Sequence, residues 1–149
     1  MSKLPPCISK VRFGSFLAYS PRGTSADSVL SRKIAYGIKN ATAGYIKYAV
    51  SRLLAEMAAG KCANLLHEVL GKDVLVVPCP RSSLLVPGAL WPSKVICDEL
   101  VSQGLARESV VIVQRVTAVP KSSTAAAGAR SKPLDHIKSM KVVDKAPRA

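Results

Sequence analysis

A short apolar segment that runs into a proline-bounded polar turn constrains the fold of this chain most. Residues 74–77 read Val-Leu-Val-Val, with no alternation of apolar and polar side chains. Such a strand is typical of a parallel sheet that helices cover on both faces. Pro78 and Pro80 follow, and because proline has no backbone N–H to donate, the strand must end there. We therefore expect an α/β fold with a parallel sheet core flanked by helices.

The turn after this strand offers groups that can bind an anion. Beyond Pro80, Arg81 supplies a guanidinium, and Ser82 and Ser83 supply hydroxyls and backbone N–H groups. Open α/β sheets bind ligands in loops at the carboxyl ends of their strands, and successive N–H groups in a turn can hold phosphate. The alternative is that this segment only connects a strand to a helix, with Arg81 exposed to solvent.

The rest of the chain alternates between strand and helix patterns. We expect further strands over 11–19, 110–116 and 140–143, and helices from the N-cap Asp27 to about Asn40, from Ala43 to about Gly60, over 61–70 and over 91–105. The helical stripes, which indicate ordinary core packing, are Leu30, Ile34 and Ile38; Ile46, Val50, Leu53 and Met57; and Val95, Ile96 and Leu100. The segments 74–77, 91–105 and 110–116 then form one βαβ unit, for which a right-handed crossover is the rule.

Three segments lack these patterns. Residues 1–10 contain Pro5-Pro6 and are expected to form an irregular arm, and residues 144–149 form a short tail. Residues 118–131 are small and polar, so they have few bulky side chains to bury and are expected to be mobile. A single domain over 11–143 lies between the arm and the tail.

Charge is the strongest signal in the composition, with 22 basic against nine acidic residues and a net charge of +13. Residues 1–60 hold nine basic and two acidic side chains, residues 61–109 five of each, and residues 110–149 eight and two. This surplus suits a phosphate-rich partner, either a nucleic acid or a polyphosphate. Few residues are aromatic, which limits base stacking. General basicity without a specific partner is the alternative.

The cysteines and the apolar runs indicate which kinds of site and which cellular location to expect. The four cysteines stand far apart, at Cys7, Cys62, Cys79 and Cys97, so neither a zinc site nor a disulfide framework is indicated. Cys79 is either a reactive thiol or, like the others, a small buried residue. The longest apolar runs fall far short of the ~18 to 20 residues of a membrane span, and the first six residues lack a signal-peptide core. We expect a cytoplasmic protein with no membrane partner.

Several motifs follow one another along residues 13–143. They are Tyr36-Gly37-Ile38-Lys39, the segment 76–83 (Val-Val-Pro-Cys-Pro-Arg-Ser-Ser), Arg115, Lys121-Ser122, Gly128-x-Arg130 and His136-x-x-Ser139-Met-Lys-Val. In this order and spacing they resemble the competence-protein-F-like phosphoribosyltransferases. The resemblance implies a type I phosphoribosyltransferase fold, in which a twisted parallel sheet lies between helices.

The resemblance also implies roles for particular residues. Pro80, Arg81, Ser82 and Ser83 would hold the diphosphate of phosphoribosyl pyrophosphate (PRPP), which Mg²⁺ accompanies if the chain is an enzyme. The flexible loop that closes over the reaction would be residues 117–131, with Lys121 and Arg130 as its cations and as the candidate catalytic residues.

One motif of that family is missing. Its members carry an aliphatic strand, two adjacent acidic residues and a Thr/Gly-rich turn that holds the 5-phosphate and the ribose hydroxyls. Here Asp98-Glu99 lies within an expected helix, and Asp144 is followed by Lys-Ala-Pro. The resemblance therefore implies an incomplete, C-terminally truncated fold, with a pyrophosphate-type loop but no 5-phosphate cradle.

Two hypotheses about function follow. In the first, the chain is a phosphoribosyltransferase-family protein that is inactive alone, as a truncated or split enzyme. In the second, it is a non-catalytic basic component of a bacterial assembly, for example in phage defence, that binds nucleic acid and partner proteins. A parallel sheet cut short exposes an unpaired edge, which favours association with another chain.

Overall fold

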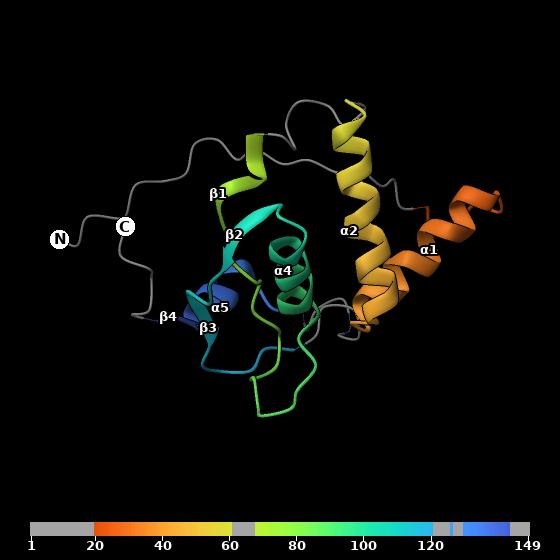
Figure 1. The fold of residues 1–149 in the computed structure, drawn as a ribbon. Coiled ribbons are helices and arrows are strands. Elements are labelled where there is room, and N and C mark those ends of the chain that lie inside the picture. Colours follow the sequence, from red (N-terminus) through yellow and green to blue (C-terminus); the bar gives the residue numbers. More distant parts are fainter. Residues whose placement is uncertain (1–19, 61–67, 121–125, 127–129, 144–149) are drawn as a thin grey trace.

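The computed structural model describes residues 20–60, 68–120, 126 and 130–143. Its elements are α1 (Ala26–Lys39), α2 (Ala43–Ala58), β1 (Gly71–Val76), α4 (Pro92–Ser102), β2 (Ala106–Ser109), β3 (Val113–Arg115), α5 (Pro133–Lys138) and β4 (Met140–Val142). Figure 1 shows α4 between the α1–α2 pair and the β1–β2 pair, with α5, β3 and β4 beyond the sheet. The chain is thus mixed α/β, with a small parallel sheet beside helices, as the sequence predicts.

The first two helices form a closely packed pair. Ser25, rather than the predicted Asp27, caps α1, because its Oγ accepts a hydrogen bond of 3.2 Å from the Ser28 N–H. Asp27 lies in the first turn instead, where a negative charge suits the helix dipole. Gly37 is buried against Tyr45, and a Cβ at position 37 would lie only 2.3 Å from Tyr45 Cγ. The missing side chain therefore lets α1 approach α2.

The core lies along α2, where the predicted apolar stripe is confirmed. Its buried members are Ile46, Val50, Leu53 and Met57, and they cluster with Leu105. Helix α4 covers this cluster with the predicted side chains Val95, Ile96 and Leu100, all partly buried. The α2 residues recur every three or four positions, and Ile96 and Leu100 on α4 are four apart, so each helix turns one side toward the other.

The predicted βαβ unit is present, but its second strand begins earlier than expected. β1 pairs in parallel with β2, and Val76 lies opposite Ser109. The connecting helix α4 ends at Ser102, and Gly104 then adopts a left-handed φ of +73°, which turns the chain directly along β1. The strand partner of β1 is therefore Ala106–Ser109, and the prediction of 110–116 for this place was wrong.

The apolar run 110–116 is divided between two sheets. Val110 still donates to the Val76 carbonyl at 2.9 Å, which extends the β1–β2 ladder. β3 instead pairs antiparallel with β4, and Arg115 lies opposite Met140. The short strand predicted over 140–143 is thus confirmed for Met140–Val142. The preceding helix α5 was not predicted.

The expectation that 74–77 is buried on both faces is wrong. Val74, Leu75 and Val76 are only half-buried, and Val77 is 43% exposed. Within the described residues the sheet has only two strands, so each has an open edge and fewer neighbours cover its side chains.

Several expectations fall outside the described residues. They are the arm 1–10, the strand 11–19, most of the helix 61–70, most of the segment 118–131, and the tail 144–149. Among the helices that the structure describes, none has the length and apolarity to cross a membrane.

Candidate functional site

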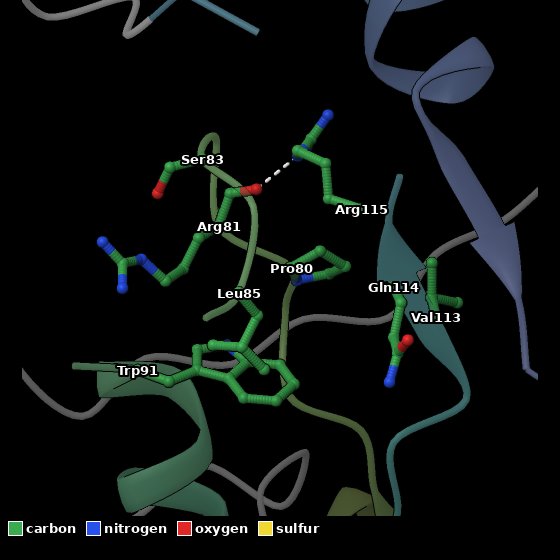
Figure 2. A pocket seen from close by; sticks show the side chains of 8 residues that line it. All are labelled: Pro80, Arg81, Ser83, Leu85, Trp91, Val113, Gln114 and Arg115. Carbon is green, nitrogen blue, oxygen red and sulfur yellow. Dashed lines mark hydrogen bonds between the residues drawn. The ribbon is translucent and has the colours of Figure 1, made fainter. Parts of the chain in front are cut away.

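The turn after β1 and the end of β3 line one small pocket, shown in Figure 2. It has a volume of about 130 Å³. The residues around it are Pro80, Arg81, Ser83, Leu85, Trp91, Val113, Gln114 and Arg115. They come from the loop between β1 and α4 and from β3, so the pocket lies where a loop of the first sheet meets a strand of the second.

Arg115 holds these two segments together. Its Nε donates a hydrogen bond to the Arg81 carbonyl oxygen, and a second guanidinium nitrogen donates to Ser139 Oγ. Ser139 is buried, and its hydroxyl in turn donates to the His136 carbonyl at 2.8 Å. The Val119 N–H adds a bond of 2.8 Å to the Ser82 carbonyl. The position of the turn is therefore determined by residues that are distant in the sequence.

Hydrogen bonds connect the other side of the turn to residues at the start of α4. Trp91 Nε1 and Ser93 Oγ both donate to the Cys79 carbonyl, at 3.0 and 2.7 Å. One nitrogen of the Arg81 guanidinium donates to the Leu90 carbonyl, and Figure 2 shows this side chain directed away from Arg115. The turn is thus held in one conformation by bonds on both sides.

The pocket is electropositive. Two half-buried arginines, Arg81 and Arg115, line it, and no acidic side chain does. Within the described part of the chain, neither arginine forms a salt bridge with a carboxylate. Buried or partly buried charges are usually paired, so this pocket favours an anion that brings the missing negative charge.

The structure brings together some of the predicted site residues. Pro80, Arg81 and Ser83 line the pocket, whereas Ser82 contributes its carbonyl to the bond with Val119. Arg130 is exposed and does not line the pocket, and Lys121 lies outside the described residues. That the predicted site residues contact a ligand remains a prediction.

Sequence reasoning assigned no site role to five of the lining residues: Leu85, Trp91, Val113, Gln114 and Arg115. Arg115 was named only as one of the motifs that carry the family resemblance. One signal was available for Gln114 and Arg115, because they are the only polar residues in the apolar run 110–116. Trp91 gave no comparable signal, because a tryptophan before a helix is equally consistent with packing.

The two cysteines within the described residues differ in environment. Cys79 is exposed, against the expectation of a small buried residue, while Cys97 is buried as expected. Burial raises the pKa of the Cys97 thiol, and the neighbouring Asp98 carboxylate raises it further, whereas Lys94 and the Ser109 hydroxyl partly offset these effects. Cys97 is therefore a protonated core thiol. No cluster of three or more metal-ligating side chains occurs among the described residues.

Comparisons with known protein families, with characterised proteins and with solved structures find no match for this chain.

Proposed function

We propose that the pocket between Arg81 and Arg115 binds the diphosphate group of a phosphorylated ligand, of the class to which PRPP belongs. The observation that carries this proposal is that two half-buried arginine residues line one pocket whose lining lacks a carboxylate. The resemblance to the phosphoribosyltransferases supplies the ligand class, since the same turn would hold pyrophosphate in that family.

The arginines retain donors for such a ligand. A guanidinium carries five N–H groups. Arg81 uses one nitrogen for the Leu90 carbonyl, and Arg115 uses two nitrogens for Arg81 and Ser139. Their remaining N–H groups make no hydrogen bond to the described residues. Phosphate oxygens match this planar arrangement of donors and carry the opposite charge.

The size of the pocket limits what it can hold. About 130 Å³ is well below the ~300 to 1,000 Å³ typical of sites for drug-sized ligands. The pocket therefore suits a phosphate or diphosphate group, and the rest of a sugar phosphate would extend outside it. Its lining includes no carboxylate, so it does not fit a resident Mg²⁺, and the proposal concerns the anion alone.

The proposal assigns binding to this pocket and not group transfer. In phosphoribosyl transfer, C1 of the ribose becomes cationic as pyrophosphate leaves, so a catalyst must position both ends of the donor. The lining residues offer contacts only for the leaving group. The chain is therefore proposed as the diphosphate-binding part of a phosphoribosyltransferase-like protein that is inactive alone.

Isothermal titration calorimetry with inorganic pyrophosphate tests the proposal. Arg81→Gln should weaken binding by about 10- to 150-fold, since a hydrogen bond to a charged group contributes roughly 1.5 to 3 kcal/mol. Arg107→Gln is the matched control, because it removes the same charge from an exposed residue that does not line the pocket. If both variants weaken pyrophosphate binding equally, the net charge of the chain explains the effect and the proposed site is contradicted.

The nucleic-acid hypothesis is the alternative outcome of the same experiment. If pyrophosphate does not bind and a single-stranded oligonucleotide does, the affinity should fall with salt at a log–log slope of about −0.7 per phosphate contact. That result would contradict the proposed diphosphate site and favour a basic nucleic-acid surface.

A further inference from the structure

The segment between the pocket and α4 is uncharged and largely apolar. Residues 82–93 read Ser-Ser-Leu-Leu-Val-Pro-Gly-Ala-Leu-Trp-Pro-Ser. Figure 1 shows this part of the chain, in green, extending away from the sheets beyond the end of α4. We refer to residues 84–91 as the apolar loop. Its large aliphatic side chains are open to solvent, with Leu84 45%, Leu85 47%, Val86 59% and Leu90 51% exposed.

The apolar loop nevertheless has a defined shape. Its tip is a turn closed by a hydrogen bond of 2.9 Å from the Ala89 N–H to the Val86 carbonyl. Pro87 occupies the second position of this turn and Gly88 the third, with φ at +75°, which is the arrangement of a type II turn. At its base, hydrogen bonds from Arg81 to the Leu90 carbonyl and from Trp91 to the Cys79 carbonyl hold the two ends of the loop together. Aliphatic side chains on both limbs are therefore presented to solvent on a loop whose ends and tip are hydrogen-bonded.

The surroundings of the apolar loop are largely apolar, with one cation on each side of the uncharged segment. It borders an open hollow of about 540 Å³, in whose lining Lys94 is the one charged residue. Arg81 precedes the uncharged segment and Lys94 follows it, the latter paired with Asp98 at 2.5 Å. The whole chain carries a charge of +13. An occupant of this surface should thus combine an apolar interior with negative charge at its boundary.

We propose that the apolar loop inserts into the interfacial region of an anionic lipid membrane. Peripheral membrane binding requires exposed apolar side chains to enter the acyl boundary, together with basic charge that attracts anionic headgroups. Both are present here. Exposed aliphatic side chains on both limbs of a loop suit a fluid bilayer, which adapts its shape to them, better than the flat face of a folded partner. The inference revises the expectation of no membrane partner, which rested on the lack of a spanning segment, and it does not depend on the diphosphate site.

Trp91 makes the proposal directly measurable, because it is the one tryptophan of the chain and lies at the base of the loop. The whole 149-residue chain is mixed with phosphatidylcholine vesicles that either contain or lack about one-third phosphatidylserine. The anionic vesicles should shift the Trp91 emission to shorter wavelength and carry the protein into the pellet on sedimentation. Brominated acyl chains should quench the emission.

Val86→Asp should weaken binding to the anionic vesicles about tenfold or more, because it places a charge at the tip in place of an exposed valine that the lipid would bury. Val142→Asp is the matched control, since Val142 is 64% exposed but lies on β4, and it should bind like the parent chain. Circular dichroism checks that each variant is folded, and Leu90→Ser replaces Val86→Asp if the latter unfolds.

Three results would overturn the proposal. The first is an unchanged Trp91 spectrum with no sedimentation on anionic vesicles. The second is an equal loss of binding in Val86→Asp and Val142→Asp, which would mean that charge alone holds the protein on lipid. The third is an emission shift that grows with protein concentration without vesicles and disappears in Val86→Asp, which would assign the loop to a second copy of the chain.

Discussion

The guanidinium of Arg115 donates a hydrogen bond to the main-chain carbonyl oxygen of Arg81, 34 residues earlier in the chain. This bond joins the end of β3 to the turn that follows β1, and it brings two arginines to one pocket. Because the acceptor is a backbone atom, the bond depends on the side chain at position 115 but not on the side chain at position 81. The two arginines should therefore respond differently to substitution.

Arg115→Gln should lower the free energy of unfolding by about 2 to 4 kcal/mol, because it removes the hydrogen bonds to the Arg81 carbonyl and to buried Ser139. A hydrogen bond from a charged donor contributes roughly 1.5 to 3 kcal/mol, and water partly replaces the lost bonds. Urea unfolding measures the change. Arg107→Gln, at an exposed position, should stay within about 0.5 kcal/mol of the parent chain. Equal stability of the two variants would contradict a role of Arg115 in joining the sheets.

Arg81→Gln should leave the fold largely intact, since Arg115 still finds the carbonyl at position 81. Only the bond to Leu90 is lost, so the unfolding free energy should fall by about 1 kcal/mol or less. Urea unfolding of Arg81→Gln and Arg115→Gln, measured side by side, shows whether a loss of pyrophosphate affinity accompanies a loss of stability. A large loss of stability in Arg81→Gln would make any drop in pyrophosphate affinity uninformative about direct contact.

Gly37→Ala should destabilise the protein although alanine is the better helix former. The added methyl group would meet Tyr45 at its Cγ, Cβ and Cδ2 atoms, all within 2.5 Å, and overpacking costs roughly 1 to 3 kcal/mol against a gain of about 1 kcal/mol in helix propensity. Gly44→Ala on α2 is the control of opposite sign, because nothing lies within 4 Å of its added Cβ. Thermal unfolding should thus show a lower Tm for the first variant and a higher Tm for the second.

Cys97 should make the protein lose stability at alkaline pH. Its pKa in the folded chain lies above the ordinary value of 9.0, because burial and Asp98 disfavour the thiolate. Below pH 9 the thiol is protonated in both states and its contribution is fully present, whereas above pH 9 the unfolded chain ionises first and stability falls. Urea unfolding from pH 7 to 10 should show a steeper decline for the parent chain than for Cys97→Ala. Equal slopes would contradict the raised pKa.

The two cysteines should also differ in reactivity. In a chain with Cys7 and Cys62 replaced by serine, one thiol should react rapidly with a disulfide reagent at neutral pH, and Cys79→Ala should abolish that fast phase. The reason is that Cys79 is exposed while Cys97 is buried and protonated. Mass spectrometry of the labelled peptides identifies the modified residue, and rapid labelling of Cys97 would contradict its burial.

The chain alone should not transfer a phosphoribosyl group. On the proposed function the pocket contacts the leaving diphosphate alone. A donor without bonds to its 5-phosphate lacks about 5 kcal/mol or more of binding energy, which corresponds to a loss of at least about 10³-fold in rate. The assay follows pyrophosphate release from PRPP with a panel of bases and amines. Turnover at the rate of an ordinary enzyme, abolished by Arg81→Gln, would overturn this expectation.

The sequence by itself determined the helical core. The stripe of Ile46, Val50, Leu53 and Met57 repeats with the period of a helix, and each of these residues is buried in the structure. A pattern of this kind is local, because one face of one helix carries it, so no knowledge of the partner is needed. The proline-bounded turn after residues 74–77 was predictable for the same reason, since Pro78 and Pro80 end a strand whatever it pairs with.

Only the tertiary structure decided how the strands pair. The run 110–116 was apolar enough for one central strand, yet its first residue extends the β1–β2 ladder while Val113–Arg115 pairs with Met140–Val142. Strand pairing depends on backbone bonds between distant segments, and a short apolar run does not specify its partner. The left-handed turn at Gly104 brings the polar segment Ala106–Ser109 alongside β1, and this proximity is not visible in its composition.

The candidate site shows the same division. Arg81 could be identified because it follows a strand in a proline-bounded turn, which is a local pattern. Its relation to Arg115 could not, because a hydrogen bond to a main-chain carbonyl leaves no requirement on the residue type that accepts it. Residue identity determined which groups can bind an anion, and the contact between β3 and the turn after β1 decided which of them share a pocket.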